Sequence, residues 1–430
     1  MRKIIVYSLK KLHLYNIVRR IFALFYPVKC SLKKMYYKEE VKNKIRNTAV
    51  EAKKIVKDIE TNTGKEIIYL FQYTYYTNDG QYYISGGGER YATDLSELIY
   101  RMGYQPILIQ LGLPQTQRIW RQKRGILYVL GLNIDLPLYT NVIEMLTQPR
   151  LAIYSGYADF GKKHFSPNIM ISHGITWDAP QCDVNIDHIK KILLSADELV
   201  SVDTNTISWL RATFSKTISE KKIPMHYVPN YTDLEKYKPD PSKKDKNHIK
   251  VIFPRRCSPE RGFWLITKAL PQLMDKYENI VFDYVGFIHT KDVEQAIEQL
   301  KKQYPNRINH YFVDAEEMYK TYQAADIALI PTLYCEGTSL SCIEAMACGN
   351  VVISTNIGGL PNLIIDKYNG RLIKPVMQDL LDTLDEVMGD EAARKEMSEN
   401  AVNVSKVFSK LNWERRWEKI LSNRLKVNQK

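Results

Sequence analysis

A chain of 430 residues with 45% apolar and 25% charged residues can bury two domain cores, and this composition argues against a disordered protein. The formal net charge of +13 is confined to residues 1–57, which hold 16 Lys or Arg residues against three Glu residues. Residues 58–430 are formally neutral, so no nucleic-acid partner is expected, because a groove for one would need a basic face. The six cysteines form no CxxC pair, which fits a reducing cytoplasm and indicates no structural metal.

The first 64 residues are interpreted as a basic amphipathic N-terminal extension. Their uncharged runs, at 4–9, 12–18 and 21–28, are too short to span a bilayer, and paired basic residues interrupt any signal-peptide core. Aromatic residues accompany the apolar positions, so residues 1–57 are expected to bind an anionic membrane surface. The alternative is a helix that packs on the protein body and exposes its basic face to solvent.

From residue 65 onward, strand-like and helix-like segments alternate in two series, which predicts an α/β protein with parallel sheets. The first domain is predicted over 65–235, a polar linker over 236–248 and the second domain over 249–405. A C-terminal helix and tail, 406–430, carries Trp413 and Trp417 at i, i+4 spacing and is expected to cross the domain junction. The predicted strands are 67–71, 106–110, 169–172, 199–202, 226–228, 249–253, 280–285, 327–330, 351–354 and 371–373. Two Rossmann-like domains in tandem place a ligand cleft between the carboxyl ends of their strands.

The segment PTLYCEGTSLSCIEAMACG, residues 331–349, ends an apolar strand and opens a helix. Glu336 lies on the turn and Glu344 on the first turns of the helix. Between them, backbone N–H groups at a helix N-terminus favour an anion, and the carboxylates can accept hydrogen bonds from hydroxyls. This pattern suits a sugar nucleotide. The alternative is a capping box over 341–344 with Glu336 as a solvated loop residue.

The frame Glu336-x7-Glu344 resembles the donor-site signature of the retaining glycosyltransferases of family 4, which have the GT-B fold. Further segments match this family in order: Gly86-Gly-Gly-Glu-Arg90 its glycine loop, 228–233 its domain-exit motif, and Arg256 with Arg261-Gly262 its basic element. The similarity covers roughly residues 65 to 425. Three positions depart from the family pattern: Arg261 replaces Lys, Tyr231 replaces Gly, and Thr338-Ser339 replaces an aromatic-Gly pair.

The resemblance implies roles for residues on both sides of the cleft. Arg256 and Arg261 would stabilise the departing diphosphate, Glu336 would hold a sugar hydroxyl and Glu344 the ribose hydroxyls. His173 would face the donor sugar from the first domain. The implied catalytic residues are therefore Glu336, Arg256, Arg261 and His173, and the implied donor-binding residues are Glu344, Gly337, Thr338, Ser339, Leu340, Gly86, Gly87 and Gly88.

Each of these positions also has an alternative interpretation. His173 alone would be a structural histidine, and the two arginines a solvated basic turn. Gly86–Gly88 forms only a broken dinucleotide fingerprint. The sequence contains no Asp-x-Asp pair, so neither a metal nor another cofactor is expected.

The resemblance implies a retaining hexosyl- or deoxyhexosyltransferase. It would move a sugar from a nucleotide-diphosphate sugar to a glycan or lipid-linked acceptor, in bacterial-type surface polysaccharide or glycoconjugate synthesis. The expected location is cytoplasmic, peripheral on the inner face of the cell membrane. Two alternatives remain open: a nucleotide-sugar epimerase of the same fold, and a non-catalytic membrane-bound scaffold.

Overall fold

The computed structural model describes the greater part of the chain after the first 37 residues. The described residues are 38–84, 86–114, 116–121, 127–134, 142–143, 145–156, 165–175, 185–288, 290–334 and 336–427. Most of the predicted N-terminal extension, 1–37, lies outside them. None of the helices in these ranges is long and apolar enough to cross a membrane.

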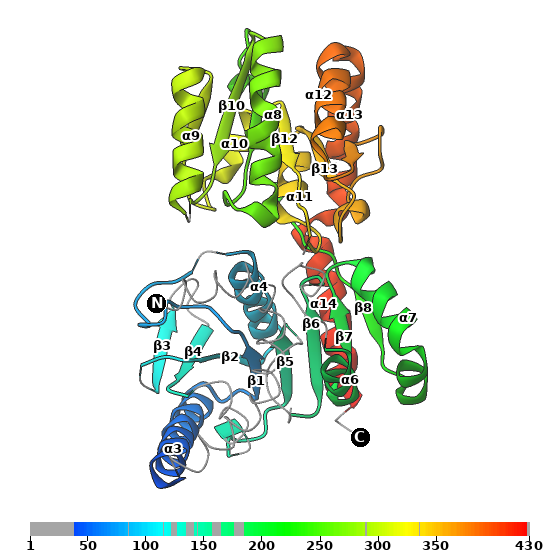
Figure 1. The fold of residues 1–430 in the computed structure, drawn as a ribbon. Coiled ribbons are helices and arrows are strands. Elements are labelled where there is room, and N and C mark those ends of the chain that lie inside the picture. Colours follow the sequence, from blue (N-terminus) through cyan, green and yellow to red (C-terminus); the bar gives the residue numbers. More distant parts are fainter. Residues whose placement is uncertain are drawn as a thin grey trace, which may run out of the picture.

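The described residues form two α/β domains, one above the other in Figure 1. The sheet of the first domain has the strand order β3-β4-β2-β1-β5-β6-β7-β8, parallel except that β3 runs antiparallel to β4. Its strands are β1 (Ile67–Phe71), β2 (Gln105–Leu111), β3 (Gln117–Arg121), β4 (Leu127–Leu132), β5 (Leu151–Ser155), β6 (Asn168–Ser172), β7 (Leu199–Ser201) and β8 (Met225–Tyr227). Helices α3 (Lys38–Thr63), α4 (Gly87–Arg101), α6 (Ile186–Ser195) and α7 (Thr204–Lys221) accompany this sheet.

The second domain has a fully parallel sheet in the order β11-β10-β9-β12-β13-β14. Its strands are β9 (Ile249–Phe253), β10 (Ile280–Val285), β11 (Ile308–Tyr311), β12 (Ile327–Ile330), β13 (Val351–Thr355) and β14 (Arg371–Ile373). Its helices are α8 (Phe263–Lys276), α9 (Lys291–Gln303), α10 (Met318–Gln323), α11 (Leu340–Ala347), α12 (Met377–Gly389) and α13 (Glu391–Ser405). Separate apolar clusters cover the two faces of the sheet, as a parallel sheet requires.

The predicted α/β architecture with two parallel-sheet domains is confirmed, and all ten predicted strands are present within one or two residues. Four strands are absent from the prediction: β3, β4, β5 and β11. In β11, with the sequence INHY, only Ile308 is fully buried, so the strand lacks a continuous apolar run. It pairs with β10 at the edge of the sheet, where one side needs no partner strand.

Helix α3 packs on the first domain, beneath its sheet in Figure 1. Ala49, Ala52, Val56 and Ile59 recur at helical spacing, and all four are buried in the same cluster as Tyr69 of β1. The sequence interpretation places residues 1–64 in an extension separate from the first domain. In the structure, residues 38–63 are instead part of the core of that domain.

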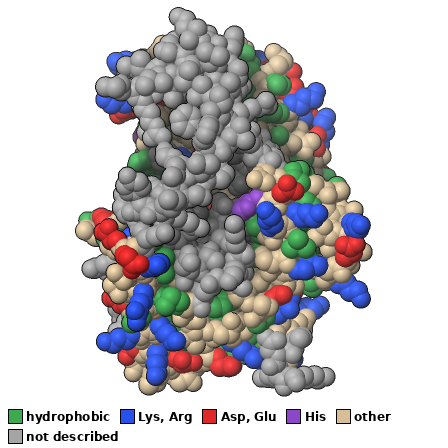
Figure 2. Space-filling view, turned by 60° about the horizontal axis from the view of Figure 1, so that its bottom comes forward, with side chains coloured by type: hydrophobic (Ala, Val, Ile, Leu, Met, Phe, Trp, Pro, Cys, Tyr) green, Lys and Arg blue, Asp and Glu red, His purple; other side chains and the backbone are tan. Residues whose placement is uncertain are grey.

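The charges of the described residues are dispersed over the surface. On the face shown in Figure 2, Lys and Arg side chains are interspersed with Asp and Glu side chains. Residues 58–430 are formally neutral, and α3 up to residue 57 adds seven Lys or Arg against three Glu residues. The other nine of the 16 basic residues lie in 1–37, which contains no Asp or Glu.

The chain crosses between the two domains twice. The first crossing follows β8, and its Tyr237 is buried in the second domain. The second crossing leads into α14 (Lys410–Val427), which returns along the first domain, drawn in red in Figure 1. Trp413 and Trp417 are buried there against Tyr91 of α4, as expected for a helix that crosses the junction. The two crossings are hydrogen-bonded to each other, because Thr232 accepts from the Lys410 N–H and donates its own N–H to Phe408.

Candidate functional site

The candidate site lies where the connections of the second sheet diverge. Strands β9 and β12 are neighbours, but the chain leaves β9 toward β10 and leaves β12 toward β13, on the other side of the sheet. Parallel sheets bind ligands in the crevice at such a switch point, outside the carboxyl ends of the strands. The segments that follow these two strands carry Arg255, Arg261 and Glu336.

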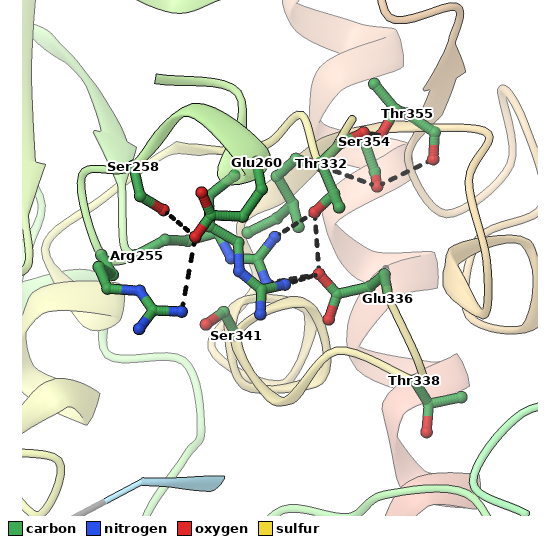
Figure 3. A network of polar contacts seen from close by, with 12 residues as sticks. Arg255, Ser258, Glu260, Thr332, Glu336, Thr338, Ser341, Ser354 and Thr355 are labelled. Atoms are coloured by element: carbon green, nitrogen blue, oxygen red, sulfur yellow. Dashed lines mark hydrogen bonds and ion pairs between the residues drawn. The ribbon is translucent and has the colours of Figure 1, made fainter. Parts of the chain in front are cut away.

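Glu336 is the centre of a hydrogen-bond network, shown in Figure 3. Its Oε2 atom accepts from Arg255 Nη2 at 2.6 Å, from Arg261 Nη1 at 2.6 Å and from Thr332 Oγ1 at 2.8 Å. The Glu336 side chain is 9% exposed and that of Arg255 is 8% exposed. Three donors on one buried oxygen fix the position of this carboxylate before any ligand binds.

Arg255 occupies the position that the sequence assigns to Arg256. The Arg256 side chain is 48% exposed and lies 3.6 Å from Glu260, away from Glu336. After β9 the chain bends sharply, with the Arg255 N–H bonded to Phe253, and Gly286 packs directly on the Arg255 carbonyl. This bend directs Arg255 inward and Arg256 toward solvent. Arg255 and Arg261 therefore contact Glu336, whereas Arg256, which the sequence assigns to the diphosphate, does not.

The electrostatics of this network favour a bound anion. Burial alone would raise the pKa of Glu336, but Arg255 and Arg261 hold it below its usual value, so the carboxylate is charged. Burial lowers the pKa of Arg255, and the nearby Arg261 adds to this effect. The charge of a bound anion would oppose this lowering of the Arg255 pKa. Two guanidinium groups against one carboxylate leave one net positive charge in a nearly dry site.

The loop from Gly337 to Leu340 contacts the first domain directly. A Cβ atom placed on Gly337 would lie 2.6 Å from the His173 carbonyl oxygen, and one on Gly174 would lie 2.8 Å from the Gly337 nitrogen. A Cβ atom on Gly87 would lie 2.9 Å from the Leu340 side chain. Glycines thus permit close approach of the two domains at these positions. The structure places the glycine loop Gly86–Gly88 opposite the start of α11.

Thr338 and Ser339 differ in what their side chains contact. Thr338 Oγ1 donates to the Val202 carbonyl at 2.7 Å and accepts from the Asn230 N–H at 2.9 Å, so it joins the domains and lies apart from Glu336 in Figure 3. Ser339 Oγ is buried and has no hydrogen-bond partner among the described residues. Of the two, only the Ser339 hydroxyl has both its donor and its acceptor capacity unused among the described residues.

His173 lies at the end of β6 with its ring engaged within the first domain. Its Nε2 atom is 3.0 Å from Ser155 Oγ, and its ring packs edge-on against Tyr91 at 5.1 Å. Burial lowers the pKa of His173 to about 4, so the ring is neutral at pH 7. The backbone of His173, rather than its ring, touches the loop at Gly337.

Glu344 is held by a residue of the other domain. Arg90 of α4 places both terminal nitrogens 2.9 Å from Glu344 Oε1. The Glu344 side chain is 7% exposed and that of Arg90 is 31% exposed. The carboxylate that the resemblance assigns to the ribose hydroxyls is thus ion-paired with Arg90 in the structure.

Three residues near this cleft are absent from the predicted site. Arg255 directly precedes Arg256, which the resemblance implies, and Arg90 is the last residue of the glycine-loop motif that begins at Gly86. Gln72 follows β1, and its Oε1 atom is buried without a hydrogen-bond partner among the described residues. Its amide nitrogen lies 3.3 Å from where a Gly88 Cβ would be. No local sequence pattern marks Gln72.

The described residues contain no group of three or more His, Cys, Asp or Glu side chains placed to hold a metal ion. Cys257, Cys342 and Cys348 are free and buried in the second domain. Burial raises the pKa of the Cys257 and Cys348 thiols to about 12, so these two are protonated core side chains.

Residues 235–404, which contain this network, match the family model of glycosyl transferases group 1. The chain is 26% identical over 220 residues to the lipopolysaccharide 1,2-N-acetylglucosaminetransferase of Salmonella typhimurium, covering 47% of this chain and 57% of that protein. It is 24% identical over 370 residues to the phosphatidylinositol N-acetylglucosaminyltransferase gpi3 subunit of Schizosaccharomyces pombe, covering 78% and 77%. The first of these relatives is thus matched over little more than half of its length.

Two solved structures share the fold over most of the chain. Sucrose-phosphate synthase from Thermosynechococcus elongatus superposes with a TM-score of 0.70 at 18% identity, covering 84% of this chain and 99% of that chain. HepE of Anabaena, solved with UDP and glucose, superposes with a TM-score of 0.65 at 17% identity, covering 83% and 100%. The expected two-domain GT-B architecture is confirmed by these superpositions.

Proposed function

We propose that this chain is a group 1 glycosyltransferase that transfers a sugar from a nucleotide-diphosphate sugar to a hydroxyl-bearing acceptor, because residues 235–404 match that family's model. The observation that carries the proposal is the buried Glu336 carboxylate bound by Arg255 and Arg261 at the switch point of the second sheet. The pair of guanidinium groups would bind the diphosphate, and Glu336 would hold both groups in place. The glycine loop of the first domain would cover the donor from the opposite side.

The chemistry follows from where charge develops. As the bond between the sugar and the diphosphate breaks, the sugar becomes oxocarbenium-like and the diphosphate gains negative charge. Arg255 and Arg261 are already oriented, so they stabilise that charge without reorganisation. Glu336 keeps its charge in this site and can accept a hydrogen bond from a sugar hydroxyl through its second oxygen.

Retention of the anomeric configuration and independence from metal are parts of this proposal. The two guanidinium groups supply the positive charge that a divalent cation would supply at a diphosphate. EDTA should therefore leave turnover within about twofold of its initial value. Loss of turnover in EDTA, with recovery in magnesium or manganese, would contradict this part. The anomeric configuration of the product, read by NMR, tests retention.

The proposed acceptor is a glycan or a lipid-linked glycan of a surface polysaccharide or glycoconjugate. The support is that the two relatives above are named for a lipopolysaccharide and for phosphatidylinositol. The proposed sugar is a hexose or deoxyhexose. A screen of UDP, GDP and TDP sugars, first by thermal shift and then by product formation with candidate acceptors, tests both.

The same screen separates transfer from epimerisation and from a scaffold role. Incubation with donor alone should leave the sugar configuration unchanged and release nucleotide only slowly. Conversion of the donor to an epimer without acceptor would establish the epimerase. Absence of turnover on every donor and acceptor, with intact nucleotide binding, would favour the scaffold.

The proposed location is the cytoplasmic face of a membrane, reached through the basic N-terminal segment. Nine basic residues and no acidic residue in 1–37 would attract anionic lipids. Deletion of 1–37 should abolish co-sedimentation with anionic vesicles and leave the melting temperature unchanged. Deletion of 1–63 should also expose the apolar surface under α3 and cause aggregation, because Ala52 and Val56 are buried. Vesicle binding that persists without 1–37 would refute this location.

A further inference from the structure

The ion pair between Arg90 and Glu344 joins the two domains through the carboxylate that the proposed function assigns to the ribose. Arg90 lies on the first turn of α4, directly after the glycine loop, and Glu344 lies within α11. Both guanidinium distances are 2.9 Å, and they end on the same oxygen. Burial alone would lower the pKa of Arg90, but Glu344 raises it above its usual value, so the guanidinium is charged. The contact is therefore a charged clamp across the cleft.

A ribose cannot occupy the same place as this guanidinium. The Glu344 side chain is 7% exposed, and Arg90 approaches it from the first domain, which is the side from which a ligand in the cleft would reach it. Nucleotide binding therefore has to move Arg90, or else Glu344 cannot hold the ribose.

The space for that movement lies beside Arg90. A cavity of about 200 Å³ at the domain junction has Arg90 in its wall. Four carboxylates line this cavity against three cations, one of which is Arg90 itself. These residues are Asp94, Glu97, Asp233 and Glu316, with Arg90, Lys236 and Lys410. Asp94 already accepts from Lys410 and Tyr231. Apart from Arg90, however, the wall has four carboxylates against two lysines, so a guanidinium that leaves Glu344 moves toward excess negative charge.

We propose that Arg90 is a nucleotide-displaced gate. In this structure it holds Glu344 across the cleft; when a nucleoside diphosphate binds, the ribose takes Glu344 and Arg90 moves toward the acidic cavity. This inference rests on the proposed function, because it requires a ribose at Glu344. The ion pair between Arg90 and Glu344 competes with the donor, so part of the free energy of donor binding is used to break that pair.

The test compares Arg90→Gln with Arg101→Gln. Arg101 lies at the other end of α4 and pairs with Glu414 at 2.9 Å, so the control also removes an ion pair from the same helix. Affinities for UDP, GDP and TDP, and for inorganic pyrophosphate, are measured by calorimetry on the full chain. Arg90→Gln should bind the preferred nucleoside diphosphate about fivefold more tightly. It should bind pyrophosphate, which has no ribose, with unchanged affinity, and Arg101→Gln should change neither affinity.

Further readouts keep the outcomes distinct. Arg90→Lys keeps the charge but cannot donate from two nitrogens, so its nucleotide affinity should lie between those of the native chain and Arg90→Gln. Hydrogen exchange at the start of α11 should rise in nucleotide-free Arg90→Gln. Unchanged or weaker nucleotide binding by Arg90→Gln, or an equal gain for pyrophosphate, would overturn the gate and leave the proposed function intact. If neither the native chain nor Arg90→Gln binds any of the nucleotides, the proposed function fails as well.

Discussion

The two domains hold their polar site residues in opposite ways. In the second domain, Glu336 is bound by Arg255, Arg261 and Thr332, all of the same domain, so this network requires no contact with the first domain. The residues of the first domain reach the site only across the cleft, through Arg90 and the backbone of His173. The charge that would bind a diphosphate is therefore preorganised, whereas the groups that would enclose the donor depend on domain closure.

The largest effect is expected where the preorganised network is broken. Glu336→Gln should lower kcat by about 100- to 1000-fold, because the neutral amide cannot hold two guanidinium groups in one position. Nucleoside diphosphate binding should not weaken, since the net positive charge of the network increases. Steady-state kinetics and calorimetry measure the two effects. The matched control is Glu260→Gln, on the exposed ion pair with Arg256, which should stay within about twofold of native activity. Equal activity of both variants would contradict a special role for Glu336.

The next largest effect should come from preventing closure without changing any charge. Gly337→Ala would place a methyl group 2.6 Å from the His173 carbonyl oxygen, so the domains could not approach as closely. We expect a roughly 10- to 100-fold loss of kcat/KM, because small misplacements of reacting groups are costly. The methyl group would also lie 2.7 Å from the side chain of Val202, which is buried in the first domain, so the melting temperature should fall modestly while activity falls much further. Gly389→Ala is the control, because its Cβ would meet no atom within 4 Å. An unaffected Gly337→Ala enzyme would show that productive closure does not bring these loops together.

A third comparison separates the two adjacent arginines. Arg255→Ala should weaken nucleoside diphosphate binding by about tenfold or more, because it removes a buried cation and leaves Glu336 with one guanidinium. Arg256→Ala should change binding by less than about twofold, because this side chain is half exposed. Calorimetry with the nucleotide found in the donor screen measures both variants. The reverse order would restore the assignment of Arg256 made from the sequence.

The replacement expected to affect activity least is that of His173, and its effect is on the pH dependence of stability. Its pKa in the folded chain is about 4, below the ordinary value of 6.5, so the unfolded chain binds more protons between these pH values. Stability should therefore fall as the pH is lowered from 6.5 toward 4. Replacement of His173 by Asn should remove the part of that fall caused by this histidine, about 2–3 kcal/mol for a shift of this size. Denaturant melts at pH 4.5 and 7.5 measure the difference. An identical pH dependence in the native and variant chains would show that His173 titrates normally.

A structural feature of this protein can be predicted from the sequence when the residues that form it are close together in the chain. Ten of the fourteen described strands and the Glu336-x7-Glu344 frame are recognisable in the sequence, because each is a short local pattern. The choice between Arg255 and Arg256 cannot be made from the sequence, because spacing does not reveal the bend after β9 that turns Arg255 inward. The pair Arg90–Glu344 joins residues 254 positions apart, and no local pattern specifies such a contact.

Helix α3 shows a second limit. Its buried face is built from Ala49, Ala52, Val56 and Ile59, and its other positions are rich in Lys and Glu. Because small residues contribute little hydrophobicity, the apolar stripe is a weaker signal than the charged positions around it. The sequence therefore indicates a charged extension over 1–64 more strongly than a core helix. The helical spacing of the four residues was the available signal for core packing.

The return of α14 to the first domain has a consequence for the order of folding during synthesis. Trp413 and Trp417 complete the apolar cluster on one face of the first sheet, yet they lie among the last 20 residues of the chain. A ribosome adds about 5–20 residues per second from the N-terminus, so the second domain emerges complete while the first still lacks this helix. The face of the first sheet that receives α14 is exposed throughout that interval. A released chain truncated before residue 410 should therefore hold a folded second domain and an unfinished first domain that chaperones can bind.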